Sequence, residues 1–577
     1  MLLTSLITTS LISLASATAV DSIKNTTTPP FCRSIPSDSS WPPVEEWDLF
    51  NQTVNGNLIA TIPISAPCHE TLFGESNSLF SQEKCDALRS EWFYSTTHLP
   101  SSSSPMAYTF SNNSCNPFLA PKTPCTIGYH VAYAVNATRV ADFQATIRFA
   151  TVHNIRLVIR NTGHDYLGKS TGAHALSIWT HNLKSMDLIR EYQGRDYKGP
   201  AVKVGAGVET LEVYEFADSH DLMIVGGNCP TVGFAGGYIQ GGGHGPLSSK
   251  FGLAADQVLE YEVITAAGDI TIATAVDNSD LFWALRGGGG STYGVVVSVT
   301  VKAFPDTSFS TSYMEIFNDG NNTDDLYSVI GTFLLVLPLL VDAGAIAIFV
   351  VSAEGFSLTP AISPGMTPAE LDAYFDPVFD RLHELGLKYN YSSSAYPGFL
   401  DTYNSVSTVA NVSDQNIGGR FIPRPLVENN GTDALLDVIR YISLQRGGLF
   451  VGNAINVKGG VSVSDEVSAN PHFRDALFSA TIGTFIDYLD WDTTSSRIRS
   501  ITSDLIPRIE ALTPGGSAYL NEGDVHQPNF QSVFYGNHYD RLLRIKREYD
   551  PHDMFYAQTA VGSEHWRQEL DGRLCRI

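Results

Sequence analysis

Apolar positions change their spacing repeatedly after residue 126, and each change predicts an element of secondary structure. Residues 137–154 carry apolar side chains at helical intervals, and the IRLVIR run at 155–160 is typical of a buried strand. The same reasoning predicts a helix over 208–221 and strands over ALSIWT, AVKVGAG and LEYEVITAAGDITIA (175–180, 201–207 and 259–273). The chain is therefore expected to be α+β.

The pattern continues beyond this region. SDLFWALRG (279–287) predicts a short helix with Ser279 as its N-cap, and the glycine-rich turn after it leads into a long strand ending near Phe304. The nearly apolar segment 332–351 contains Pro338 and Gly344, so we interpret it as a helix, a turn and a buried strand rather than a membrane span. Thr367-Pro368-Ala369-Glu370 is a capping box that predicts a helix over 370–386.

Changes in composition along the chain predict five parts. Residues 1–19 resemble a signal peptide, although a buried N-terminal helix is the alternative, and residues 20–125 predict an irregular collar that carries cysteines. Residues 126–305 hold most of the regular pattern, and 306–510 predict a second, α+β domain. Residues 511–577 end in a charged helix and an extended tail.

Secretion has support beyond the N-terminus. Eight Asn-x-Ser/Thr triplets begin at Asn25, Asn51, Asn112, Asn136, Asn321, Asn390, Asn411 and Asn430, which is typical of a glycoprotein. Seven cysteines leave at least one unpaired, and five of them precede residue 126, which indicates a disulfide-stapled collar. The cysteine and histidine spacings predict no metal site.

Net charge excludes two classes of partner. The chain has 36 Lys and Arg against 60 Asp and Glu, a formal charge of −24. Such a surface repels phosphate backbones and anionic lipids, so we expect no nucleic-acid and no membrane binding. We expect a small-molecule substrate and a monomer.

Three glycine-rich stretches carry the candidate chemistry. They are RNTGHDYLG (160–168), GGNCPTVGFAGGYIQGGGHG (226–245) and RGGGGSTYGVV (286–296), and each lies beside a predicted strand. Glycines let a backbone approach a ligand closely, so the three turns together favour one extended dinucleotide held by backbone N–H groups. Taken separately, the second stretch could be tight turns in a barrel, and His164 could be an ordinary loop histidine.

These stretches resemble the berberine-bridge-enzyme-like branch of the FAD-linked oxidases, in the vanillyl-alcohol-oxidase/p-cresol-methylhydroxylase superfamily. The matching segments are 160–168, 229–258, 280–301 and, near the C-terminus, FYGNHYDRLLRIKREYDPHDMFYAQTAVG (534–562). The likeness is strong over 125–305 and 515–565, and the collar is similar to that of secreted fungal members. It implies a two-part FAD-binding domain of the p-cresol-methylhydroxylase type, a substrate domain with an antiparallel sheet, and a C-terminal segment that returns to the FAD domain.

The resemblance assigns two covalent links to FAD. His164 matches the histidine that family members join to the flavin 8α-methyl carbon, and a neutral imidazole is a suitable nucleophile. Cys229 matches the cysteine that bicovalent members join to flavin C6, which would leave six cysteines for up to three disulfides. A buried free thiol is the alternative for Cys229.

Further cofactor-binding residues follow from the same motifs. Val232 matches a position that gates oxygen above the flavin, and a β-branched residue there resembles the oxidases. The resemblance also implies FAD contacts for Arg160, Asn161, Thr162, Gly163, Asp165, Gly226, Gly227, Thr231, Gly233, Gly236, Gly237, Gly241, Gly242, Gly243, Tyr535 and Asn537.

The catalytic base is not fixed by the resemblance, because this chain departs from the family there. Tyr238 stands near the position of a histidine in several relatives, and Glu522 stands where sugar-oxidising relatives carry a tyrosine. Tyr519, Glu522 and Tyr238 are therefore the candidates. A tyrosinate needs a lowered pKa, whereas a carboxylate does not.

The resemblance implies a secreted FAD-dependent oxidase. We expect hydride transfer from a carbinol (or amine) carbon to covalently bound flavin, with O2 reduced to H2O2. The substrate would be an oligosaccharide or a phenolic or other secondary-metabolite alcohol. The alternatives are a flavin dehydrogenase with a non-O2 acceptor and a catalytically idle flavin-binding glycoprotein.

Overall fold

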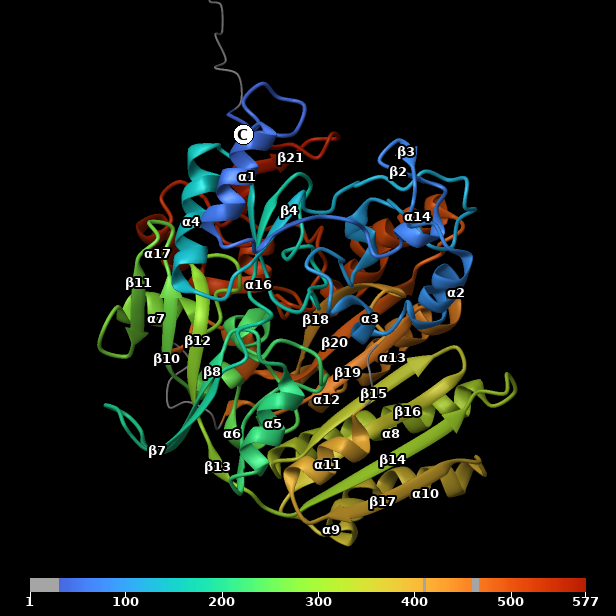
Figure 1. Ribbon diagram of the computed structural model, residues 1–577. Helices are drawn as coiled ribbons and strands as arrows, with labels where there is room; N and C mark the ends of the chain where they lie inside the picture. The colour runs from blue at the N-terminus through green and yellow to red at the C-terminus, as the bar shows by residue number, and fades with distance from the viewer. Residues whose placement is uncertain (1–30, 408–410, 459–465) are drawn as a thin grey trace, which may run out of the picture.

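The computed structural model describes residues 31–407, 411–458 and 466–577, and within them a four-, a five- and a seven-stranded sheet stand out (Figure 1). Helices and sheets are mixed, so the predicted α+β class is confirmed. The expected signal peptide and the sequon at Asn25 lie outside the described residues.

The four-stranded sheet has the order β1-β4-β6-β5. Helix α4 (Val140–Val152) connects β4 to β5, and β4 and β5 both run parallel to β6. The carboxyl end of β5 therefore leads directly into the RNTGH turn, at the edge where open parallel sheets bind ligands. The strands are β1 (Leu58–Ala60), β4 (Tyr133–Asn136), β5 (Leu157–Arg160) and β6 (Leu176–Trp179).

The five-stranded sheet is antiparallel, in the order β11-β10-β12-β8-β7. Its strands are β7 (Met186–Gln193), β8 (Lys198–Gly205), β10 (Val258–Ile264), β11 (Ile270–Thr274) and β12 (Val295–Lys302). Residues 259–273, which we predicted as one strand, form the β10–β11 hairpin, because Gly268 at φ +85° turns the chain there.

Two helices adjoin this sheet. Helix α5 (Thr210–Asp218) follows β8 as predicted. Helix α7 (Ser279–Leu285) precedes β12, but the predicted N-cap was wrong. Asn278, in the left-handed conformation that asparagine tolerates, is the N-cap, and Ser279 is the first helical residue.

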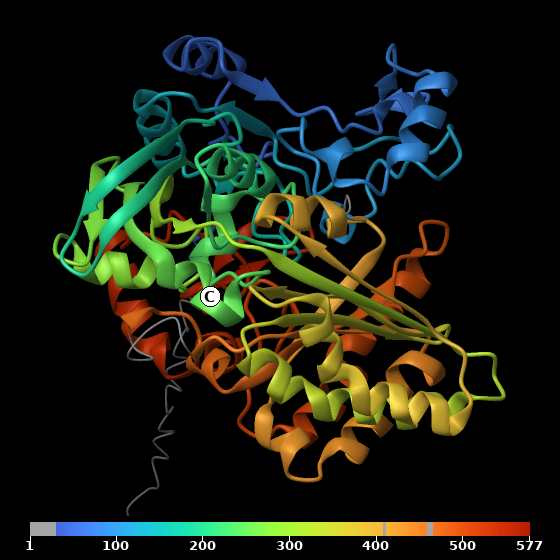
Figure 2. The same cartoon turned by 90° about the horizontal axis from the view of Figure 1, so that it is seen from below.

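The seven-stranded sheet is antiparallel throughout, in the order β17-β14-β16-β15-β19-β20-β18. Its strands are β14 (Phe309–Phe317), β15 (Ile346–Ser352), β16 (Gly355–Pro364), β17 (Asn390–Tyr396), β18 (Gln415–Pro423), β19 (Leu449–Ala454) and β20 (Ala476–Phe485). One face of this sheet is covered by three helices, α8 (Thr323–Asp342), α10 (Asp376–Leu385) and α13 (Thr432–Arg440). Figure 2 shows them on the side away from the N-terminal collar, which is drawn in blue.

Segment 332–351 forms the predicted helix, turn and strand, as the end of α8 and most of β15. Among the described residues, α8 is long and apolar enough to cross a membrane, but 67% of its most apolar window is buried. Phe333, Leu337 and Val341 pack into the core beneath the seven-stranded sheet, so α8 is a core helix. The predicted helix over 370–386 divides into α9 (Pro368–Asp372), a 3-10 turn and α10, where Pro377 opens the new helix.

The N-terminal collar carries the helices α1 (Val44–Thr53), α2 (Gln82–Glu91) and α3 (Ser95–His98). Two disulfides, Cys68–Cys85 and Cys115–Cys125, staple it internally. A third, Cys32–Cys575, joins it to the C-terminus across 543 residues. The last segment also forms a parallel bridge from Phe555 to Leu157 in β5, so the chain returns to the four-stranded sheet.

Candidate active site

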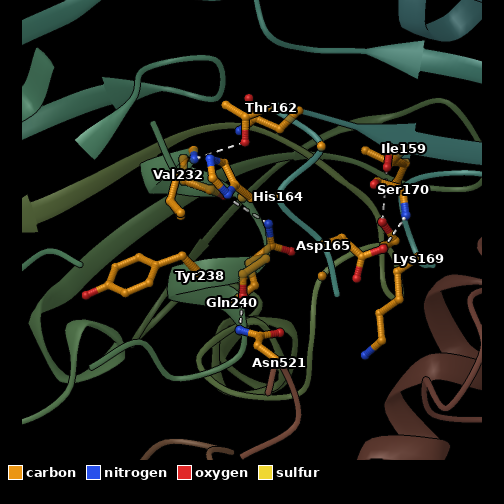
Figure 3. A pocket seen from close by; sticks show the side chains of 18 of the residues that line it. Ile159, Thr162, His164, Asp165, Lys169, Ser170, Val232, Tyr238, Gln240 and Asn521 are labelled. Atoms are coloured by element: carbon orange, nitrogen blue, oxygen red, sulfur yellow. Dashed lines mark hydrogen bonds between the residues drawn. The ribbon is translucent and has the colours of Figure 1, made fainter. Parts of the chain in front are cut away.

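Segments far apart in the sequence line one cavity of about 200 Å³. They come from the end of β5, the glycine-rich loop after residue 231, the turn before β12 and the C-terminal segment. Figure 3 shows His164, Val232, Tyr238 and Asn521 around this space.

Most of the predicted site residues reach the cavity wall. These are Asn161, Thr162, Gly163, His164, Asp165, Val232, Gly233, Gly236, Gly237, Tyr238, Tyr519 and Glu522. Gly237 has no heavy atom of the described residues within 4 Å of the place where a Cβ would stand, and at Gly236 the nearest atoms belong to the Asn161 side chain. The backbone of this loop is thus open to a ligand.

Other predicted residues lie away from the wall. Gly226, Gly227, Gly241, Gly242 and Gly243 are buried beside the lining loop, where they pack against protein groups. Tyr535, in α16 (Phe530–Tyr535), is buried and donates to the carbonyl oxygen of Thr559, and Asn537 is exposed. These seven residues are not among those that line the cavity.

His164 lies beside two other predicted cofactor-binding residues. Its Nε2 is 2.6 Å from the Thr231 hydroxyl and 3.9 Å from Cys229 Sγ. Cys229 has no disulfide partner among the described residues. Burial lowers the pKa of His164 to about 3, and His98 and Arg160 add to that effect. The imidazole is therefore neutral over the physiological range.

The attachment turn is shaped by Gly163 over Arg160. Gly163 has φ +89°, and a Cβ there would lie 2.5 Å from Arg160 Nη2. Arg160 is 1% exposed and donates through Nε to the Ser101 carbonyl at 3.2 Å. Asp165 completes the turn by accepting from the backbone N–H groups of Leu167 and Ser170.

The base candidates lie on the opposite segment. Glu522 Oε1 is 2.8 Å from His244 Nε2, and its second oxygen accepts from Thr481 at 3.4 Å. Burial disfavours a charged His244, but the Glu522 carboxylate outweighs it and raises the pKa of that imidazole. His244, buried behind the wall, escaped the sequence analysis because nothing in GGGHG marks it as the partner of a residue 278 positions away.

The two tyrosines are poor bases in this environment. Burial raises the pKa of Tyr519 and of Tyr238, and the Glu522 charge adds to the shift for Tyr519. Tyr519 Oη accepts from Asn521 Nδ2 at 2.7 Å. Tyr238 Oη has no hydrogen-bond partner among the described residues.

Comparison with known proteins decides the family. Residues 131–274 match the family model "FAD binding domain", and residues 518–562 match "Berberine and berberine like". The chain is 42% identical over 566 residues to FAD-linked oxidoreductase sor8 of Hypocrea jecorina, which covers 98% of this chain and 96% of that protein. This chain belongs to the berberine-bridge-enzyme-like FAD-linked oxidoreductases.

A second relative and a solved structure support the same family assignment. VAO-type flavoprotein oxidase VAO615 of Thermothelomyces thermophilus is 41% identical over 574 residues, which cover 97% of this chain and 98% of that protein. The crystal structure of VAO-type flavoprotein MtVAO615 from Myceliophthora thermophila C1 superposes with a TM-score of 0.89 at 38% identity, over 95% of this chain and 100% of that one. The predicted family, the FAD-binding fold and the oxidoreductase class are thereby confirmed.

The cavity of this FAD-linked oxidoreductase suits an anionic dinucleotide. Lys169 is 8% exposed and lies on the cavity wall. Among the described residues, neither its Nζ nor either Nη atom of Arg160 has a hydrogen-bond partner. Burial lowers the pKa of Lys169 to about 8 and that of Arg160 to about 10, and nearby Asp165 opposes both shifts. Buried cations without partners are costly until an anion pairs with them.

Lys169 is a cation that we did not predict from the sequence. We expected backbone N–H groups and Arg160 at the dinucleotide site, and Lys169 is buried on the cavity wall as well. The sequence shows a lysine five residues after His164 but not that the loop folds inward and buries it. A diphosphate, with its two negative charges, fits this donor set.

Proposed function

We propose that this chain is a secreted oxidase that oxidises a carbinol (or amine) carbon of a small molecule and reduces O2 to H2O2. Bound FAD supplies the redox chemistry, accepting hydride and passing electrons to O2. One observation carries the proposal: a single cavity is lined by His164, whose ring lies 3.9 Å from Cys229 Sγ, and by the carboxylate of Glu522.

We further propose that His164 and Cys229 both bind FAD covalently. A neutral imidazole on the cavity wall and a free thiol 3.9 Å from it support two links to one ring. The alternative, that Cys229 is only a buried thiol, predicts that a His164→Ala variant retains no covalent flavin.

Glu522 is the proposed base. It would accept the hydroxyl proton of the substrate, and His244 and Thr481 would orient its two oxygens. E522Q should lower kcat by about 10²- to 10⁴-fold, the usual contribution of general-base catalysis. Y519F should lower kcat by a smaller factor than E522Q. A larger loss of kcat in Y519F would instead make Tyr519 the acceptor of the substrate proton.

Val232 supports O2 as the acceptor, because it lies on the cavity wall at the position associated with oxygen access. After photoreduction, reoxidation by O2 should be faster than reoxidation by a quinone. The reverse order, measured by stopped flow, would make the protein a dehydrogenase.

Secretion is supported by three disulfides and by sequons on the surface. The asparagines exposed in the structure are Asn112, Asn321, Asn390, Asn411 and Asn430. Extracellular oligosaccharides and phenolic or other secondary-metabolite alcohols are the proposed substrates.

An oxygen-electrode screen of the purified protein tests the function. Sugars, phenolic alcohols and amines form the panel, and at least one class should consume O2 with equimolar H2O2. A flavin-loaded protein that no member of the panel reduces would instead be the catalytically idle glycoprotein.

A further inference from the structure

Thr231 is the hydrogen-bonding partner of His164. Its Oγ1 lies 2.6 Å from His164 Nε2 and 3.5 Å from Cys229 Sγ, so one hydroxyl contacts both proposed attachment residues. His164 Nδ1 has no hydrogen-bond partner within the described parts of the chain. The short contact at Nε2 therefore fixes one nitrogen of the ring and leaves the other available.

The Thr231 hydroxyl is itself held by the N-terminal collar. Ser95, the first residue of α3 and fully buried, places its Oγ 2.8 Å from Thr231 Oγ1. Helix α3 is fixed in turn through His98, whose ring nitrogens bond the Ser104 hydroxyl at 2.8 Å and the Trp92 carbonyl at 2.7 Å. A buried hydroxyl of the collar thus reaches the FAD site through one intermediate side chain.

We propose that Thr231 and Ser95 are positioning residues for covalent flavin attachment. The Thr231 hydroxyl accepts the Nε2 proton of His164, and its own proton is donated to Ser95. This arrangement holds the imidazole in one tautomer and one orientation, with the Nδ1 lone pair free to attack. The inference rests on the proposed attachment of FAD at His164.

The attachment reaction is an oxidation, and it balances with O2 as the oxidant. A bond forms between an imidazole nitrogen and the flavin 8α-carbon, while one C–H bond of the methyl group and one imidazole N–H bond break. The two electrons and two protons released are taken up by O2 as H2O2. Thr231 and Ser95 are not consumed; they hold the imidazole while the N–H proton is lost.

The test compares flavin attachment in T231V, T231S, S95A and the wild-type protein, each purified in its full-length form. Tryptic mass spectrometry measures the fraction of the His164 peptide that carries flavin, and absorbance measures total bound flavin. Loss of one hydrogen bond of this kind lowers a reaction rate about tenfold, so T231V should slow flavinylation of His164 by about that factor. T231S, which retains the hydroxyl, should match the wild type, and S95A should be intermediate.

S65A is the matched control. Ser65 is a buried collar serine whose hydroxyl donates to the Cys115 carbonyl, far from the cavity, so its loss should leave attachment unchanged. If T231V fails to fold, the proposal is tested by S95A, which should slow attachment, against T231S, which should not.

Two contradictory outcomes are distinguishable. Complete and equally fast His164 flavinylation in T231V and S95A would overturn the positioning role while leaving covalent attachment standing. An unmodified His164 peptide in the wild-type protein would instead overturn the attachment on which the inference rests.

Discussion

At the scale of single residues, two buried cations stand out at the site. Within the described parts of the chain, Lys169 Nζ and the two Nη atoms of Arg160 have no hydrogen-bond partner, and Gly163 closes over the arginine. The sequence predicted His164, Thr162 and Val232 at the cofactor site because their motifs resemble those of the family. It could not predict Lys169 or His244, because burial and pairing across 278 residues depend on the tertiary fold.

Gly163→Ala tests the turn. The substitution forces a Cβ into the left-handed region, at a cost of about 1–2 kcal/mol, and against the buried Arg160 guanidinium. We expect it to lower FAD content and thermal stability, as measured by absorbance and calorimetry. Gly344→Ala is the control. Gly344 has φ +92°, and no atom of the described residues lies within 4 Å of where its Cβ would stand, so this substitution carries the backbone cost alone. FAD content should be unchanged in this variant. Equal FAD content in the two variants would show that contact with Arg160 is unimportant.

The His244–Glu522 pair predicts a pH dependence of stability. The pKa of His244 is higher in the folded protein than in the unfolded chain. The stabilising contribution of the charged imidazole to the free energy of unfolding is therefore fully present below the unfolded pKa of about 6.5, and it is lost as pH rises through the folded pKa. The melting-temperature difference between wild type and H244Q should therefore be larger near pH 6 than near pH 9. A difference that is constant or grows with pH would mean that the imidazole is not charged in the pair.

At the scale of elements, hydrophobic periodicity predicted α4, β5, α5 and β12 near their observed positions. It failed where a turn lay inside an apolar pattern: residues 259–273 became a hairpin, and the 370–386 helix broke at Pro377. The match of Tyr535 and Asn537 to a C-terminal motif did not place them at the cavity, since motif spacing does not determine which face of a helix points inward.

The Cys32–Cys575 disulfide fixes the collar to the C-terminal segment, and its removal tests that role. Replacing both cysteines by serine avoids a stray thiol and frees a loop of 543 residues. The unfolding free energy should fall by about 2–5 kcal/mol, because the unfolded chain gains entropy. Denaturant unfolding measures the loss, and flavin should remain bound. An unchanged midpoint would mean that packing alone holds the collar.

At the scale of the whole molecule, three distant parts of the chain meet at one site. Ser95 comes from the collar, His164 from the end of a parallel strand and Glu522 from the C-terminal segment. We propose that the part boundaries near residues 126, 306 and 511 separate cofactor binding from substrate selection.

The most direct measurement of the central claim is mass spectrometry of the denatured, trypsin-digested protein. The account predicts one flavin joining the peptide that contains His164 to the peptide that contains Cys229, with yellow colour retained after acid precipitation. Flavin released entirely by acid, with both peptides at their unmodified masses, would contradict it.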